Sequence, residues 1–215
     1  MGTLLLKLSG PLQSWGSESR FTERKTRHEP TKSGVIGLLA AALGRRRTED
    51  ISDLSLLAFG VRIDQPGHLE RDYQTAHTRK YDKSSGRWVF DKTMPLSNRY
   101  YLSDAIFVAG FEGDDDLLGV CAHALDHPLF PLYLGRRSCP ASDRILLSHE
   151  RGRHLMQGLR EWPWEATSLR QAHSQEPEVE LEVLRDQLPD DTGGEMHEVL
   201  RDIPLSFSQE YREYS

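Results

Sequence analysis

Three consecutive residues offer the clearest chemistry in this sequence: Gly135, Arg136 and Arg137. A glycine lets the backbone pass close to a ligand because it has no Cβ atom. Two neighbouring guanidinium groups present planar sets of donors that match phosphate oxygens. The apolar segment 129–134 comes directly before them and is predicted to be a strand. These features favour a site for a polyanion, and the alternative is an ordinary strand end with two solvated arginines.

A second basic segment, residues 10–30, follows the first predicted strand and is predicted to be a loop. It mixes cations with aromatic side chains, which is typical of single-stranded nucleic acid binding, because cations contact phosphates while aromatic faces stack on bases. The candidate contacts here are Gln13, Ser14, Trp15, Arg20, Phe21, Arg24, Lys25 and Arg27. Alternatively, Trp15 and Phe21 fix the loop to the core.

The turn Pro30-Thr31-Lys32-Ser33-Gly34 opens a predicted helix over residues 33–43. Thr31 can cap this helix and Gly44 can end it. Free backbone N–H groups and the positive end of the helix dipole favour an anion at such a turn, with Lys32 and Ser33 as candidate ligands. The turn is not a nucleotide-binding P-loop, because that motif needs glycines at two positions where threonines stand.

The apolar segments predict a mixed order of strands and helices. Strands are expected at residues 3–8, 56–63, 105–111 and 129–134, and helices at 33–43 and 115–125. This order, strand–helix–strand twice over, is that of a ferredoxin-like sandwich, an α+β fold. Weaker patterns suggest strands at 179–184 and 204–207 and a short helix at 155–162. We expect a single domain over residues 1–215, and the fold of 141–215 stays open.

Residues 69–101 do not fit a minimal ferredoxin-like core. They are polar, aromatic and basic, and Ser84-Ser85-Gly86 near their middle is a turn signal. A structureless loop of this length inside a compact domain would be unusual unless it had a function. The sequence therefore predicts a protruding β-hairpin, with Tyr73, His77, Arg99 and Tyr101 as candidate contacts to nucleic acid.

The net charge of −6 hides an uneven distribution. Residues 1–47 carry nine Lys or Arg against three acids, whereas residues 161–215 carry four against fourteen. Clustered basic charge, rather than the total charge, indicates nucleic acid binding.

The apolar stretch 35–43 is too short to span a membrane, and residues 4–6 lack the flanks of a signal peptide. Two cysteines give no disulfide framework, so a reducing cytoplasm is expected.

Four blocks of sequence occur in a characteristic order. They are Gly10-Pro11-Leu12-Gln13-Ser14-Trp15-Gly16, Pro30-Thr31-Lys32-Ser33-Gly34-Val35-Ile36-Gly37-Leu38-Leu39, Arg71-Asp72-Tyr73-Gln74-Thr75 and Tyr133-Leu134-Gly135-Arg136-Arg137-Ser138-Cys139-Pro140. Together, over roughly residues 4–140, the chain resembles the CasD family of subunits in type I-E CRISPR Cascade complexes. The resemblance implies a ferredoxin-like domain of the RAMP superfamily, with a glycine-rich loop at 133–140 and a thumb hairpin at 69–101.

A member of that family would bind the 5′ handle of the CRISPR RNA (crRNA) and cap the backbone filament. It would help to seat the large subunit and meet target DNA only through the complex. The candidate RNA-binding residues are Gln13, Ser14, Trp15, Arg20, Arg24, Arg27, Lys32, Ser33, Tyr73, His77, Arg99, Tyr101, Gly135, Arg136 and Arg137. We expect them to line one groove, with the thumb wedged against the guide near its junction with the handle.

Two alternatives stay open. Relatives of this subunit in type I-C systems process precursor CRISPR RNA without metal, so the resemblance also allows an endoribonuclease that uses His28, Lys32, Tyr73 and His77. Type I-E systems delegate processing to a separate subunit, which favours a non-catalytic chain. The other alternative is a protein-interaction subunit with little RNA affinity of its own. No spacing of His, Cys, Asp and Glu indicates a metal or cofactor site.

Overall fold

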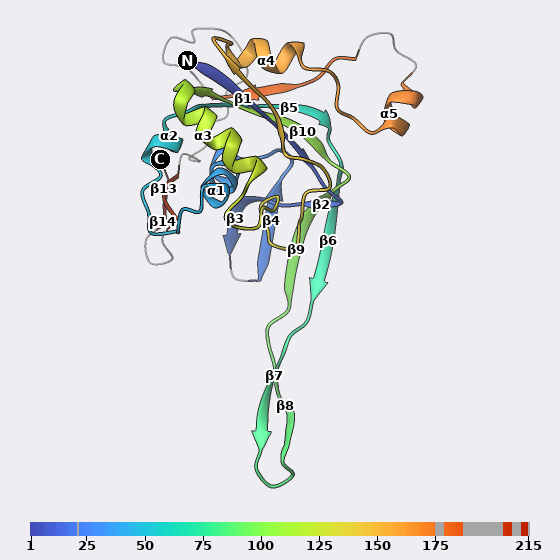
Figure 1. Cartoon of the computed structure of the whole chain (residues 1–215). Helices are drawn as coiled ribbons and strands as arrows, with labels where there is room; N and C mark the ends of the chain where they lie inside the picture. Colours follow the sequence, from blue (N-terminus) through green and yellow to red (C-terminus); the bar gives the residue numbers. More distant parts are fainter. Residues whose placement is uncertain (21, 175–178, 187–203, 208–211, 215) are drawn as a thin grey trace.

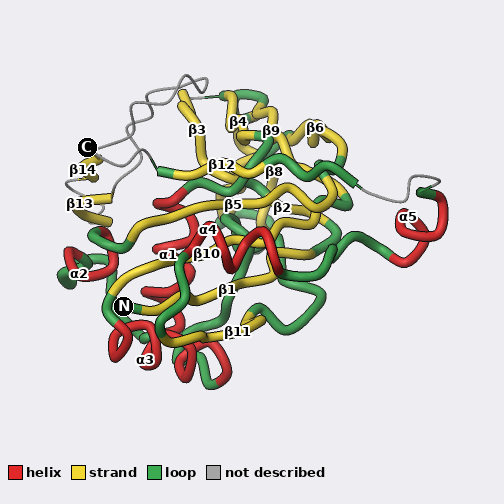
Figure 2. Tube along the Cα trace, turned by 90° about the horizontal axis from the view of Figure 1, so that it is seen from above, coloured by secondary structure: helices red, strands yellow, loops and turns green. Residues whose placement is uncertain are grey.

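The structure, a computed structural model, describes residues 1–20, 22–174, 179–186, 204–207 and 212–214. At its centre lies a five-stranded antiparallel sheet in the order β11-β1-β10-β5-β12 (Figures 1 and 2). The strands are β1 (Gly2–Ser9), β5 (Ala58–Gln65), β10 (Ile106–Gly113), β11 (Leu146–Arg151) and β12 (Val183–Arg185). The first four give the spatial order of a ferredoxin-like sheet, which confirms the predicted α+β class.

Helices cover both faces of this sheet (Figure 1). Strand β1 contributes to the packing on both faces, because successive side chains of a strand point to opposite faces. Leu4, Leu6 and Leu8 belong to the main core with α1 and α3, whereas Leu5 packs in a smaller core with α4. The helices are α1 (Lys32–Ala42), α2 (Ser52–Ser55), α3 (Asp115–Asp126), α4 (Leu155–Glu161) and α5 (Ser168–His173). None of the helices in the described ranges is long and apolar enough to cross a membrane.

The ends of α1 follow the predicted signals. The Thr31 side chain accepts a hydrogen bond from the Gly34 N–H at 3.2 Å, which satisfies one of the free donors of the first turn. Gly44, directly after the helix, has a φ of +76°, a conformation that suits glycine. Local sequence therefore determines where this helix begins and ends.

A second sheet joins the body to the thumb. It has the order β2-β9-β4-β3, with β6 also paired to β9. Its strands are β2 (Leu12–Gln13), β3 (Trp15–Arg20), β4 (Glu23–Arg27), β6 (His68–Gln74) and β9 (Ser97–Ser103). Beyond it, β7 (His77–Asp82) and β8 (Arg87–Thr93) form a two-stranded tip that projects far from the body (Figure 1). The predicted protruding hairpin is confirmed.

Two predictions about the first half of the chain need correction. The segment 10–30, predicted as a loop, contains β2, β3 and β4, and we ascribe the error to the lack of a sustained apolar period, since β4 lies against β9 with mostly exposed side chains. The predicted strand 56–63 begins later, at Ala58, because α2 and the turn after it occupy the preceding residues.

The predicted strand at 129–134 is also wrong, because this apolar segment forms no strand. Its first residues lie over the end of α1, where the N–H groups of Leu129 and Phe130 donate to carbonyls of that helix. The strand that completes the ferredoxin-like sheet is β11, which the sequence analysis missed because it mixes polar and apolar residues. The 179–184 prediction is reduced to the short β12, while the 204–207 strand is confirmed as β13 (Pro204–Phe207), paired with β14 (Arg212–Tyr214).

Candidate nucleic-acid interface

The glycine-rich loop packs directly against the segment that follows β1. Gly135 has a φ of +84°, and a Cβ atom added to it would lie 1.8 Å from the carbonyl oxygen of Ser14. The Ser14 N–H donates to the Leu134 carbonyl at 3.2 Å, which joins the two segments. Only glycine fits this contact, because any side chain would collide with backbone. Two of the four sequence blocks thus meet in space.

The polar side chains of the first block are used inside the fold. The Gln13 amide donates to the carbonyls of Leu8 at 3.0 Å and Ala105 at 2.7 Å, and its oxygen accepts from the Trp15 indole N–H at 3.0 Å. The Ser14 hydroxyl donates to a carbonyl of β9 at 3.2 Å. Gln13, Ser14 and Trp15 are all buried. Their predicted side-chain contacts to RNA are therefore corrected: they hold the loops in place, and Trp15 offers no free face for stacking.

The turn that begins α1 is likewise packed mostly inside the protein. Lys32 is only 7% exposed, and its ammonium group forms an ion pair with Asp186 at 2.7 Å. Gly34 lies against the ring of Trp15, where an added Cβ would be 2.9 Å from a ring carbon. Ser33 is partly exposed. The second block thus packs against the first, and Lys32 neutralises an acid of this chain rather than facing a ligand.

The two adjacent arginines of the glycine-rich loop have different surroundings. The Arg136 guanidinium lies 4.8 Å from the ring centroid of Tyr101, and its Nη2 donates to the carbonyls of Arg24 at 2.9 Å and Lys25 at 3.4 Å. Tyr101 is buried beneath it. Arg137 is exposed. Arg136 therefore connects three segments of the protein, and Arg137 is the one directed to solvent.

These contacts define a region that we call the junction: residues 13–15, 100–101 and 134–139. Exposed cations surround it on the second sheet, with Arg24 on β4 and Arg99 on β9 opposite one another in the register. Arg27 forms an ion pair with Glu29 at 2.7 Å. The predicted side-chain role of Arg20 falls outside the described part of the structure. The N-terminal segment and the glycine-rich loop are in contact here, because Arg136 donates to the Arg24 carbonyl, whereas Lys32 is not part of this contact.

Comparison with known proteins assigns the family. The family model described as "CRISPR-associated protein (Cas_Cas5)" matches residues 3–215 of this chain. The chain belongs to the Cas5 family. It is 33% identical over 156 residues to a protein of Escherichia coli strain K12 named "CRISPR system Cascade subunit CasD", and the match covers 67% of this chain and 69% of that protein.

Solved structures agree with this assignment. The chain matches one in a structure described as "CRISPR RNA-guided surveillance complex" with a TM-score of 0.74 and 31% identity, over 100% of this chain and 86% of that one. A second match, described as "Crystal structure of Cas protein", has a TM-score of 0.58 and 45% identity, over 75% of this chain and 71% of that one. Both matches agree with a Cas5 fold for the part of the chain that the structure describes.

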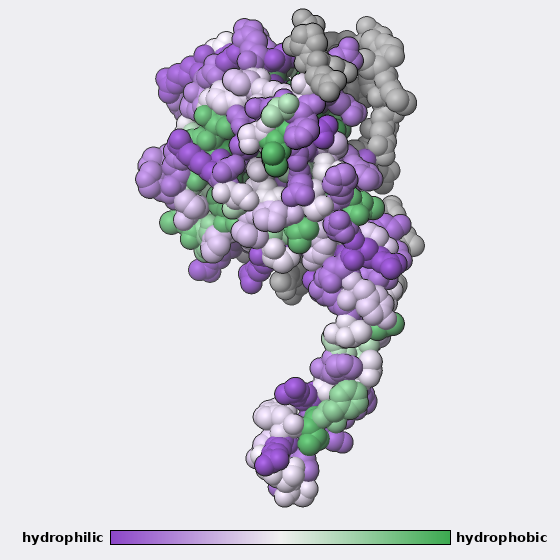
Figure 3. All heavy atoms as spheres, turned by 90° about the vertical axis from the view of Figure 1, so that its right-hand side faces the viewer, coloured by the Kyte–Doolittle hydropathy of each residue, from purple (hydrophilic) through white to green (hydrophobic). Residues whose placement is uncertain are grey.

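The thumb tip of this Cas5 chain carries aromatic side chains that the sequence analysis did not include among the candidate contacts. Tyr81, Trp88 and Phe90 are 52%, 65% and 59% exposed. The Tyr81 and Trp88 rings meet edge to face, with 5.7 Å between their centroids. The ring centroids of His77 and Phe90 are 5.1 Å apart. Tyr73, nearer the body, is also exposed. Apolar side chains are visible along the projecting arm in Figure 3. The alternation of aromatic and polar residues in the two strands was the signal that could have identified this aromatic stripe.

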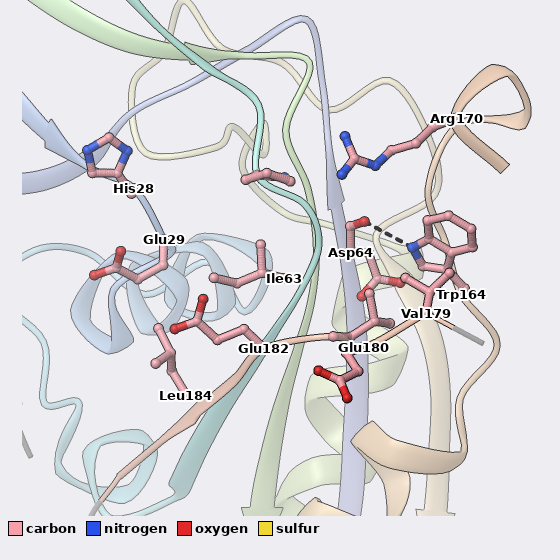
Figure 4. A pocket seen from close by; sticks show the side chains of 12 residues that line it. His28, Glu29, Ile63, Asp64, Trp164, Arg170, Val179, Glu180, Glu182 and Leu184 are labelled. Atoms are coloured by element: carbon pink, nitrogen blue, oxygen red, sulfur yellow. Dashed lines mark hydrogen bonds between the residues drawn. The ribbon is translucent and has the colours of Figure 1, made fainter. Parts of the chain in front are cut away.

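A hollow beside β5 and β12 of the Cas5 body is unsuited to a polyanion. It has a volume of about 490 Å³, and its lining includes Glu29, Glu180 and Glu182 as well as Trp164 (Figure 4). Asp64, also in the lining, accepts two hydrogen bonds from Arg62 and is fully paired. Carboxylates at the rim would repel phosphates. The exposed arginines of the second sheet, Arg24 and Arg99, therefore suit a polyanion better than this hollow does.

The thiols of this chain do not provide a nucleophile. Burial raises the pKa of Cys121 to about 11 and also raises the pKa of Cys139 in the glycine-rich loop. Thiolates, rather than thiols, attack substrates and bind metals. Among the described residues, no group of three His, Cys, Asp or Glu side chains is arranged to hold a metal ion. The exposed groups in and around the junction that suit a polyanion are therefore the arginines Arg24, Arg99 and Arg137.

Proposed function

We propose that this chain is a crRNA-binding subunit of a Cascade-type surveillance complex. The E. coli relative is named as a Cascade subunit, and the matching solved chain belongs to a CRISPR RNA-guided surveillance complex, which supports membership in such a complex. We propose further that the chain holds the 5′ handle of the crRNA, caps the backbone filament beside it and helps to seat the large subunit. Target DNA would be met only through the assembled complex.

One observation carries this proposal: the sequence blocks of the first loop and the glycine-rich loop pack together and leave exposed arginines around them. Arg24, Arg99 and Arg137 supply charge for phosphates, and the buried residues of the junction supply a rigid support. Unpaired RNA can be bound in this way because its backbone and its base faces are both accessible. Binding of this kind is steeply weakened by salt.

The thumb would meet the RNA beside the handle. Tyr73 and His77 are exposed on β6 and β7, as are Tyr81, Trp88 and Phe90 of the thumb tip. Such aromatic faces can stack on unpaired bases and deflect the strand, which is the wedge role proposed for this hairpin. Tyr101 supports Arg136 from below, so its contribution is structural.

Purification of the protein with its natural RNA tests the proposal directly. The tagged chain, expressed together with a CRISPR array and the other Cascade subunits, should retain a small RNA with one uniform 5′ end. Sequencing of the bound RNA measures this. A complex that assembles without RNA, or RNA with scattered 5′ ends, would favour a role in protein interaction alone.

We also propose that the chain does not cleave RNA. An acid–base mechanism needs its groups close together. Lys32 is buried in an ion pair with Asp186, and His77 lies on the thumb beside Phe90. Labelled repeat RNA incubated with the purified protein in EDTA should therefore stay intact. A single-site cut that disappears in His77→Ala would instead support the endoribonuclease alternative.

A further inference from the structure

Two exposed arginines are held side by side on the second sheet. Strands β4 and β9 pair in parallel, and Arg24 lies opposite Arg99 in their register. Neighbouring strands are about 4.8 Å apart, and residues opposite one another point to the same face of the sheet. The two guanidinium groups therefore extend from adjacent positions of one surface. They belong to segments separated by more than seventy residues of sequence.

No acid of the described chain neutralises this pair. No carboxylate oxygen of a described residue lies within 4.0 Å of a guanidinium nitrogen of either arginine. Asp72 lies opposite Arg99 on β6, but its carboxylate accepts a hydrogen bond from the Gln74 amide instead. Like charges directly opposite one another destabilise a sheet. A local conflict of this kind within an otherwise consistent fold is expected at functional sites.

Arg136 fixes the backbone beneath this pair. Its Nη2 donates to the carbonyl oxygen of Arg24 at 2.9 Å, and its guanidinium lies over Tyr101, two residues from Arg99 on the same face of β9. The Nη1 atom of Arg136 is buried and makes no hydrogen bond with any described residue. Arg136 is therefore engaged by the protein, whereas the two arginines that it supports are free to bind a ligand.

We propose that Arg24 and Arg99 together bind a single phosphodiester group of the RNA strand, with Arg136 as the positioning residue. The inference rests on the proposed function and names one contact within it. A phosphate between two guanidinium groups accepts hydrogen bonds from both and cancels their repulsion. Because Arg24 belongs to the β3–β4 hairpin and Arg99 to the base of the thumb, this phosphate links the two segments.

Salt-dependent binding by the full-length chain tests the shared contact. The probes are labelled CRISPR-repeat RNA and an oligo(U) of equal length, with the variants Arg24→Gln, Arg99→Gln and their combination. Each single variant should lose affinity about 5- to 50-fold for both probes. The negative slope of log K against log salt should become shallower by about 0.7. The double variant should lose little more, because one phosphate is involved. Arg160→Gln, an exposed arginine on α4, is the matched control and should bind as the wild type does.

Thermal unfolding without RNA provides a second measurement. Removal of either charge relieves the repulsion, so each single variant should unfold about 1–3 °C higher than the wild type. A purely structural role for these arginines predicts a lower unfolding temperature and would overturn the proposal. Fully additive losses of affinity in the double variant would overturn the shared contact as well.

The outcomes also separate this proposal from the proposed function. Affinity that survives the double substitution would overturn the shared phosphate contact and leave crRNA binding intact. Failure of the wild-type chain to bind either probe, together with a Cascade complex free of RNA, would overturn both. Arg136→Lys should lose affinity although the charge is retained, because an ammonium group cannot reproduce the planar contact with Tyr101 and the carbonyl of Arg24.

Discussion

The junction and the thumb tip contain the same kinds of residue in opposite surroundings. Trp15 in the junction has no exposed surface, whereas Trp88 in the thumb tip is 65% exposed. Gly135 has a φ of +84°, and a Cβ atom there would lie 1.8 Å from backbone. Gly86, at the turn of the thumb, has a φ of +66°. The nearest atom to a Cβ added there would be the Tyr81 hydroxyl, at 3.8 Å.

This contrast separates two ways in which a residue can serve RNA binding. Residues of the junction act through the fold, because they determine where the loops and their arginines lie. Residues of the thumb tip contribute little to the core, so their aromatic and cationic groups are free to contact a partner. Substitutions of the buried junction residues should therefore change stability first, and substitutions in the thumb tip or at the exposed Arg137 should change binding first.

The two tryptophans give the largest expected difference. Trp15→Ala should lower the free energy of unfolding by about 3–5 kcal/mol, because it empties a buried site and leaves the Gln13 side chain without its indole partner. Trp88→Ala should change it by less than about 0.5 kcal/mol but weaken RNA binding by about 1–3 kcal/mol. Chemical denaturation and RNA titration measure the two effects. Equal stability losses would contradict the contrast.

The two glycines test backbone fit in the same way. Gly135→Ala should destabilise the protein by about 2–4 kcal/mol, since the left-handed conformation and a collision with the Ser14 carbonyl act together. Gly86→Ala should cost about 1 kcal/mol or less, from the left-handed conformation alone. Gly152→Ala, with a φ of +71° and open space around it, is a control in the body of the protein. In urea denaturation, Gly135→Ala should lose far more stability than the other two variants, which should resemble one another.

The neighbouring arginines sharpen the contrast within one loop. Arg136→Ala should lower the free energy of unfolding by about 1–2 kcal/mol, because it removes hydrogen bonds to two carbonyls and the contact with Tyr101. Arg137→Ala should leave stability unchanged, yet reduce RNA affinity severalfold. The slope of log K against log salt should become shallower by about 0.7. An Arg137→Ala variant that binds RNA as the wild type does at moderate salt would remove this residue from the interface.

The smallest effect concerns the turn of the thumb. Hydrogen bonds from Ser85 and Ser84 lower the pKa of Asp82 from 3.8 to about 2. A carboxylate whose pKa falls on folding stabilises the turn above about pH 4, and this contribution is lost as the pH falls towards 2. An NMR titration of Asp82 should give a midpoint near 2. In a variant with alanine at both serines the midpoint should return towards 3.8.

Much of the fold could be predicted because its signals are local. Thr31 and Gly44 mark the ends of α1, and the apolar run from Leu4 to Leu8 marks β1 as a strand. The strand that completes the main sheet was misplaced, since the segment around Leu129 has an apolar run but packs its backbone on α1. Apolar composition does not specify whether a segment pairs with a sheet or lies across a helix.

The candidate site could be predicted only in outline. Glycine and two arginines in sequence indicated a phosphate-binding loop, and that signal depends on residue types alone. Which arginine faces solvent was decided by the tertiary structure, because the carbonyl that binds Arg136 belongs to Arg24, 112 residues away. The juxtaposition of Arg24 with Arg99 likewise requires β4 and β9 to pair. Residue chemistry is local, but hydrogen-bond partners and burial are set by contacts between distant segments, and these exist only in the folded chain.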